Sequence, residues 1–250
     1  MFLAILDYDH TLTTNDGVLL DKTIMDINKF VLKNKLCILS EATFNELNEI
    51  IESHDLNCDF FSISSAKGKI NNKLIFSSLN HNDLNFIINK YNNELYTAFF
   101  EDDNNSYVIK YQERLDLLYP KKNRQIITNI SEDINSIIIA MNNINLENFY
   151  KDLDDLNLDY IILAKDKNRN LVKISSNKYS KKSKIVYLLK DIYKDCRTIG
   201  VSDSINDLDF VSLCDIKIAM KKSELESKLS ITTDLDNSLN GCMDKLFKII

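Results

Sequence analysis

The sequence predicts an α/β protein with a parallel β-sheet core and an inserted α+β domain. Over roughly the first 65 residues, and again after about residue 176, short apolar runs alternate with amphipathic segments, as in strands that helices cover on both faces. Between these stretches the alternation stops and hairpin-like patterns take its place. We therefore expect a discontinuous core of residues 1–69 and 176–250, and an inserted domain of residues 70–175.

Within the core, each expected strand is a short run rich in Ile, Leu, Val or Phe. Two capping patterns, Thr23 to Asp26 and Thr43 to Glu46, predict helix starts, and Ser180 is a third candidate cap, for a helix with an apolar stripe from Ile185 to Ile192. The expected core strands are Leu3–Leu6, Leu36–Leu39, Phe60–Ile63, RTIGVS at 197–202 and IKIAM at 216–220.

The insertion combines helical and hairpin patterns. A helix is expected where Leu84, Ile87, Ile88 and Tyr91 share one face, and a second over about 146–156. Two hairpins are expected at TAFFEDDNNSYVIKY and YIILAKDKNRNLVKIS, with a strand SIIIAM between them.

The composition excludes several classes of protein. A formal charge of −6 argues against a general nucleic-acid binder, although a local basic pocket for a small anion is compatible with it. No apolar run reaches the length of a membrane span, and no basic leader with a cleavable segment is present, so we expect a cytoplasmic protein without membrane association. The five cysteines are scattered, which predicts buried reduced thiols and no metal site.

Acidic side chains follow two of the expected strands. Asp7 and Asp9 come directly after the apolar run Leu3–Leu6, and Asp203 and Asp207 follow RTIGVS. Neighbouring parallel strands share one crevice at their carboxyl ends, so we expect these four carboxylates to converge. Such a cluster repels itself unless a cation joins it, and a set of oxygen ligands favours Mg²⁺ over zinc.

The order of these motifs resembles the haloacid dehalogenase superfamily of phosphatases, and within it the Cof-type group. The first family motif matches Asp7–Thr11, the second matches Ser40, the third matches Lys181, and the fourth matches Ser202–Asp207. The resemblance covers the whole chain, because the insertion between the second and third motifs resembles the larger α+β cap of the family. It implies a Rossmann-like core carrying that cap.

The resemblance also implies a mechanism. Asp7 would attack phosphorus and form an aspartyl-phosphate, while Asp9 would act as general acid and base. The implied Mg²⁺ ligands are Asp7, the main-chain carbonyl of Asp9, and Asp203, with Asp207 in support. The side chains implied to hold the phosphoryl oxygens are Ser40, Lys181 and Asn206.

Three positions depart from the family pattern: His10 and Ser202 stand where glycine is common, and Glu41 begins a Glu-Ala pair in place of Gly-Arg. These departures leave the carboxylates in place. Glu41 is expected to contact the substrate, and His10 is expected either to contact the substrate or to pack against the protein.

Three functions fit the sequence. The leading one is a Mg²⁺-dependent phosphatase acting on a small phosphorylated metabolite such as a sugar phosphate. A phosphomutase would need a second phosphate site, built from cap cations. A catalytically inactive binding module is the third, and the presence of both Asp7 and Asp9 argues against it. The candidate cap cations are Arg114, Arg124, Lys165 and Arg169.

Overall fold

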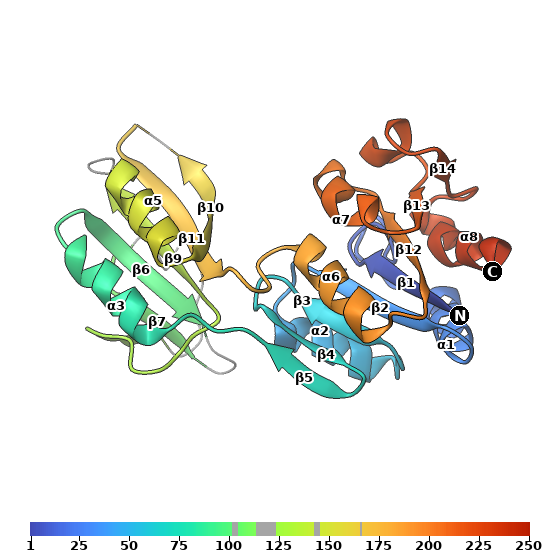
Figure 1. Cartoon of the computed structure of the whole chain (residues 1–250), viewed down its shortest axis with the longest axis horizontal. Helices are drawn as coiled ribbons and strands as arrows, with labels where there is room; N and C mark the ends of the chain where they lie inside the picture. The colour runs from blue at the N-terminus through green and yellow to red at the C-terminus, as the bar shows by residue number, and fades with distance from the viewer. Residues whose placement is uncertain (102–104, 114–123, 143–145, 166) are drawn as a thin grey trace. The chain divides into compact units, whose positions relative to one another are not determined.

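A computed structural model describes residues 1–101, 105–113, 124–142, 146–165 and 167–250 (Figure 1). The chain forms two compact units. The core unit comprises Met1–Ile75 and Lys181–Ile250, and the insertion unit comprises Phe76–Ser180. Both changes between units fall a few residues later than the expected limits of 70 and 175.

The core unit contains an eight-stranded sheet in the order β14-β13-β12-β1-β2-β3-β4-β5. Neighbouring strands from β14 to β3 run parallel, which confirms the predicted parallel core, and β4 then pairs antiparallel with β3. The strands are β1 (Phe2–Asp7), β2 (Lys35–Ser40), β3 (Asp59–Ser62), β4 (Lys67–Ile70), β5 (Lys73–Phe76), β12 (Arg197–Ser202), β13 (Ile216–Ala219) and β14 (Ile231–Thr232).

Strands β4 and β5 were not predicted from the sequence. They are joined by Asn71 and Asn72, whose φ angles of 49° and 58° are those of a tight two-residue turn. Asparagine tolerates this left-handed backbone better than most residues. In a chain with only four glycines, the turn therefore lacks the glycine that usually signals it.

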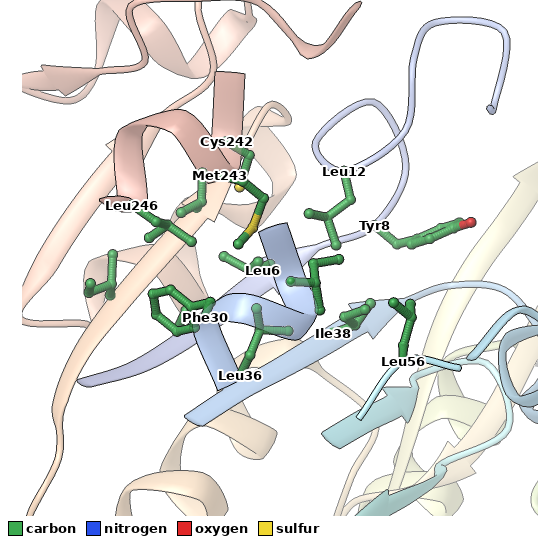
Figure 2. Packing of buried hydrophobic residues seen from close by; sticks show 14 of the residues in the cluster. Leu6, Tyr8, Leu12, Phe30, Leu36, Ile38, Leu56, Cys242, Met243 and Leu246 are labelled. Carbon is green, nitrogen blue, oxygen red and sulfur yellow. The ribbon is translucent and has the colours of Figure 1, made fainter. Parts of the chain in front are cut away.

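Helices cover both faces of the core sheet. On one face, Leu6 of β1 packs with Phe30 of α1 and with Met243 and Leu246 of α8 (Figure 2). On the other face, a Cβ on Gly200 of β12 would lie 3.2 Å from Val211 Cα, so α7 approaches the strand closely there. The core helices are α1 (Asp21–Val31), α2 (Phe44–Ser53), α6 (Lys182–Ile192), α7 (Leu208–Ser212) and α8 (Gly241–Ile249).

Of the predicted helix caps, one is confirmed and two are wrong. Thr43 and Glu46 form a complete capping box at the start of α2. Helix α1 instead begins at Asp21 after Leu20, which provides no side-chain cap. Thr23 is buried inside this helix, and its hydroxyl donates to Asn240 Oδ1 at 2.9 Å. The hydroxyl that was predicted to cap the helix therefore makes a tertiary hydrogen bond instead. Ser180 is likewise not the cap of α6, as its hydroxyl donates to Asp159.

In its described residues, the insertion unit is a six-stranded sheet, in the order β10-β11-β9-β6-β7-β8, packed with two helices. Both predicted hairpins are confirmed as antiparallel pairs, and β8, which was not predicted, lies parallel to β7. The hairpin turn at 102–104 lies outside the described residues. The described elements of the insertion unit are α3 (His81–Lys90), β6 (Leu95–Glu101), β7 (Ser106–Ile109), β8 (Arg124–Ile126), β9 (Ser136–Asn142), α5 (Leu146–Asp155), β10 (Leu158–Lys165) and β11 (Arg169–Ser176).

None of the helices in the described ranges combines the length and apolar character needed to cross a membrane.

Candidate active site

The candidate site lies in the core unit, at the carboxyl ends of three adjacent strands. Strand β1 ends at Asp7, β2 at Ser40 and β12 at Ser202. The register pairs Asp7 with Leu39 and Leu6 with Val201, so the three strands end at the same level. This is the edge at which open parallel sheets bind ligands.

A buried lysine joins two carboxylates at this edge. Lys182 Nζ lies 2.6 Å from Asp7 Oδ1 and 2.8 Å from Asp207 Oδ2. All three side chains are about nine-tenths buried. One ammonium therefore holds the end of β1 and the segment after β12 together.

The lysine at the site is thus Lys182, and the prediction of Lys181 is corrected by one residue. Lys181 is the N-cap of α6 and is exposed, whereas Lys182 is the first residue of the helix. The buried face of α6 consists of Lys182, Ile185, Val186 and Leu189. Val186 is the sequence signal that would have identified Lys182. It lies four residues after Lys182, so both side chains fall on the same helical face, whereas Lys181 does not share this spacing.

Thr11 links the first and fourth motifs. Its hydroxyl oxygen lies 3.3 Å from Asp7 Oδ2 and 3.3 Å from Asp203 Oδ1. Thr11 is buried, and the two carboxylate oxygens lie within reach of this single hydroxyl. Thr11 belongs to the first motif, but no contact of its side chain was predicted from the sequence.

Ser202 helps to hold Asp207. The Ser202 hydroxyl donates to Asp207 Oδ2 at 2.7 Å, and it accepts the main-chain N–H of Ser204 at 3.2 Å. Ser202 therefore does more than replace a glycine, because its side chain fixes one oxygen of a carboxylate that also binds Lys182.

Burial and charge together set the electrostatics of the cluster. The pKa of Asp7 is raised to about 7, chiefly because the carboxyl is buried; the ammonium of Lys182 lowers this pKa, and the charges of Asp207 and Asp203 raise it. For Lys182, burial lowers the pKa, but the charges of Asp7 and Asp207 outweigh it and raise the pKa. Lys182 thus stays charged, whereas charging Asp7 has a free-energy cost that a further cation would offset.

The other predicted residues surround this cluster less closely. Asp9 and His10 are exposed just after β1, and Asn206 is exposed in the short helix Ile205–Asp207. Ser40 is fully buried, and its hydroxyl oxygen accepts the N–H of Ala42 at 3.0 Å.

Glu41 is not drawn into the cluster. Its side chain is exposed, and within the described residues it has no hydrogen bond or ion pair. The role of Glu41 in substrate contacts stays a prediction.

The candidate phosphomutase cations lie in the insertion. Arg169 stacks on the ring of Tyr96, its guanidinium carbon 3.5 Å from the ring centroid, and Arg124 lies 6.0 Å from the ring of Tyr111. Lys165 is exposed at the end of β10. Arg114 is outside the described residues.

The site offers oxygen donors to a divalent cation. Asp7 and Asp203 present carboxylates close to one another, and one ammonium cannot balance three carboxylates. In the described ranges, no three His, Cys, Asp or Glu side chains form a ready-made metal site, so main-chain carbonyl and water ligands would have to complete the coordination. A few carboxylates supplemented by water are the ligands that Mg²⁺ prefers.

Comparison with known families identifies the family of the chain. Residues 4–246 match the sequence profile of the haloacid dehalogenase-like hydrolases. The chain belongs to this family. The resemblance to the haloacid dehalogenase superfamily that the four motifs indicate is therefore confirmed.

Three solved structures share the fold of this chain at low sequence identity. TM0651 from Thermotoga maritima matches with a TM-score of 0.75 and 14% identity, over 100% of this chain and 98% of that one. The phosphatase BT1666 from Bacteroides thetaiotaomicron matches with a TM-score of 0.70 and 15% identity, over 100% and 96%. The subclass IIB sugar phosphatase BT4131 matches with a TM-score of 0.64 and 14% identity, over 100% of both chains. Comparison with curated protein sequences gives no significant match.

Proposed function

We propose that this hydrolase is a Mg²⁺-dependent phosphatase that acts on a small phosphorylated metabolite through an aspartyl-phosphate on Asp7. One observation carries the proposal: Asp7 ends a central strand with one oxygen on Lys182 and the other on Thr11, which also contacts Asp203. The carboxylate is thereby oriented beside a cation. The sugar phosphatase and phosphatase names among similar structures support the same reaction class.

The reaction would proceed in two displacements. A carboxylate oxygen of Asp7 attacks phosphorus, the bond from phosphorus to the ester oxygen breaks, and Asp9 gives its proton to the departing oxygen. Asp9 then takes a proton from water, whose oxygen attacks phosphorus and releases inorganic phosphate with Asp7 restored. Asp9 is exposed at the edge of the sheet. A residue that exchanges protons with a leaving group and with water must be accessible in this way.

Mg²⁺ would be held by the carboxylates of Asp7 and Asp203 and the main-chain carbonyl of Asp9. When bound, it would neutralise the charge that otherwise repels a phosphate dianion from Asp7. Asp207 has both oxygens engaged by Lys182, and one of them also by Ser202. We therefore assign Asp207 to positioning the lysine rather than to direct metal binding.

Three side chains would bind the phosphoryl oxygens. Lys182 takes the role that the sequence analysis gave to Lys181, supplying a positive charge next to Asp7. The Ser40 hydroxyl accepts a main-chain N–H, so its own hydrogen remains available to a phosphoryl oxygen. Asn206 would supply an amide donor from the exposed segment before α7.

The insertion unit corresponds to the cap in this scheme, and its loops would contribute to the choice of substrate. The fold alone does not identify that substrate, because specificity lies in the site and its surroundings.

Phosphate release tests the proposal. The purified chain is incubated with p-nitrophenyl phosphate and a panel of sugar phosphates, with Mg²⁺ or with EDTA. We expect release that requires Mg²⁺, is absent in Asp7→Asn, and persists in the matched control Asp16→Asn, which changes an exposed acid in the same unit. Movement of phosphate between two positions of a sugar without release would indicate a phosphomutase. Inactivity toward the entire panel would indicate a binding module.

A further inference from the structure

A polar pocket adjoins the candidate active site within the core unit. Its volume is about 160 Å³. Asp203 lines it, and Asp203 shares the hydroxyl of Thr11 with Asp7. The side chains that matter here are His10, Asp203, Lys221, Lys222, Ser223 and Asp236.

One lysine of the pocket, Lys221, has no carboxylate partner among the residues that the structure describes. Lys222 Nζ is paired with Asp236 at 2.9 Å. Lys221 Nζ instead donates to the main-chain carbonyl of Asp234 at 2.9 Å, while the Asp234 carboxylate is held by Lys248 at 2.9 Å. Across the described ranges Lys221 forms no ion pair, so its ammonium is the group most able to take an anion.

The backbone around the pocket is held in an uncommon conformation. His10 and Lys222 have φ angles of 56° and 66°, in the left-handed region that residues other than glycine seldom adopt. Both residues line the pocket. Such conformations persist where the surrounding structure enforces them, and they cluster at ligand sites.

A buried hydroxyl also lacks a partner in the pocket. Ser223 Oγ is shielded from solvent and finds no hydrogen-bond partner in the described part of the chain. A buried hydroxyl without a partner is costly, so a ligand oxygen in the pocket would satisfy it.

We infer that this pocket binds a second anionic group of the phosphorylated substrate, a carboxylate or a further phosphate, and that Lys221 is its main determinant. The inference rests on the proposed function, because the pocket begins where Asp203 borders the phosphate site. The hydroxyl of Ser223 and the imidazole of His10 are further donors. The preferred substrates are therefore phosphorylated acids or bisphosphates rather than monophosphates of neutral sugars.

The test uses phosphonates, whose carbon–phosphorus bond is not a phosphoester. Isothermal titration calorimetry at one free Mg²⁺ concentration compares methylphosphonate with phosphonoacetate and 3-phosphonopropionate, which add a carboxylate at two distances. We expect at least one of the two acids to bind the wild type about tenfold or more tightly than methylphosphonate, the scale of one charge-assisted hydrogen bond. Lys221→Met should remove this gain, and Lys221→Arg should retain most of it.

The matched control is Lys22→Met, which makes the same change at an exposed lysine of α1 away from the pocket, and it should keep the full gain. The inference is overturned if neither acid shows a gain in the wild type, or if Lys221→Met retains the gain. Hydrolysis of p-nitrophenyl phosphate reports separately on the proposed function. Should the wild type show the gain yet hydrolyse no phosphoester, the proposed function fails, and the assignment of the pocket to a substrate fails with it.

Discussion

Lys182 Nζ lies 2.6 Å from Asp7 Oδ1, although 175 positions separate the two residues in the chain. The contact places a charged donor beside the proposed nucleophile and leaves the exposed Lys181 next to it as a natural control. It also makes the two lysines experimentally separable.

Lys182→Met should abolish most activity, while Lys181→Met should change it little. Loss of a charged group that stabilises the transition state typically lowers kcat by about 10²- to 10³-fold. Lys182→Met should also lower the free energy of unfolding by up to about 3–5 kcal/mol, because Asp7 and Asp207 lose their buried partner. Turnover of p-nitrophenyl phosphate and urea unfolding measure the two effects. Equal loss of activity in both variants would contradict the assignment of Lys182.

Asp203→Asn should remove the stabilisation that Mg²⁺ gives to the folded chain. Binding at 100 times Kd adds about 2.7 kcal/mol to the free energy of unfolding, so the wild type should melt at a higher temperature with Mg²⁺. Without Mg²⁺ the variant should be no less stable than the wild type, because one member of a like-charge cluster is gone. Thermal melts of the wild type, Asp203→Asn and Asp16→Asn, with and without Mg²⁺, provide the comparison. A full Mg²⁺ shift in Asp203→Asn would remove this residue from the metal site.

Asp9→Asn should separate the two chemical steps. p-Nitrophenolate leaves without much protonation, so the variant should still transfer phosphate to Asp7 but fail to activate the water that releases it. The expected signal is a burst of at most about one nitrophenolate per site, followed by a stall. Intact mass after an acid quench should then show an added phosphoryl group, located on Asp7 by peptide mapping.

Steady turnover by Asp9→Asn at the wild-type rate would contradict the role of this residue as general acid and base. Asp7→Asn serves as the control in the same experiment, since it should show neither burst nor added mass.

Asp215 should contribute to stability in a pH-dependent way. Its carboxylate accepts the main-chain N–H and the hydroxyl of Thr198 at 2.7 and 2.8 Å, and the N–H bond is the first cause of the lowered pKa of Asp215. A pKa lowered by folding stabilises the folded state above the unfolded pKa, and this contribution is lost as the pH falls through the folded pKa. Because Asp215 is exposed, we expect only about 1 kcal/mol.

Asp215→Asn should therefore be less stable than the wild type near neutral pH, and the difference should shrink below about pH 4. Urea unfolding across this pH range measures it. A difference that is the same at every pH would show that the charge of Asp215 is not the source.

The sequence alone predicted the parallel core and the convergence of Asp7, Asp203 and Asp207 at one edge of its sheet. An apolar run followed at once by Asp7 and Asp9 is best accommodated as a central strand that ends at the solvent-accessible edge of the sheet, because the carboxylates then avoid burial in the core. Asp203 and Asp207 were predicted at the end of the neighbouring strand for the same reason. Thr43 and Glu46 were predictable for a similar reason, because a capping box is completed within one turn of chain.

The tertiary structure decided which side chains meet. Lys181 and Lys182 are chemically identical, and only the packing of α6 on its buried face directs the second one to Asp7. Thr23 was predicted as a cap but bonds to Asn240, a residue distant in the chain. Contacts between residues far apart in sequence depend on how elements pack, and no local pattern encodes them.

The pocket beside Asp203 is likewise a product of packing. His10 belongs to the first motif, whereas Lys221 and Asp236 come from segments after β13 and β14 that carry no motif. Their convergence requires the parallel order of β1, β12, β13 and β14. The sequence could therefore predict the strand ends at which the acidic residues lie. The position of Lys221 beside Asp203, where we infer a second anion site, depends on how these strands pack.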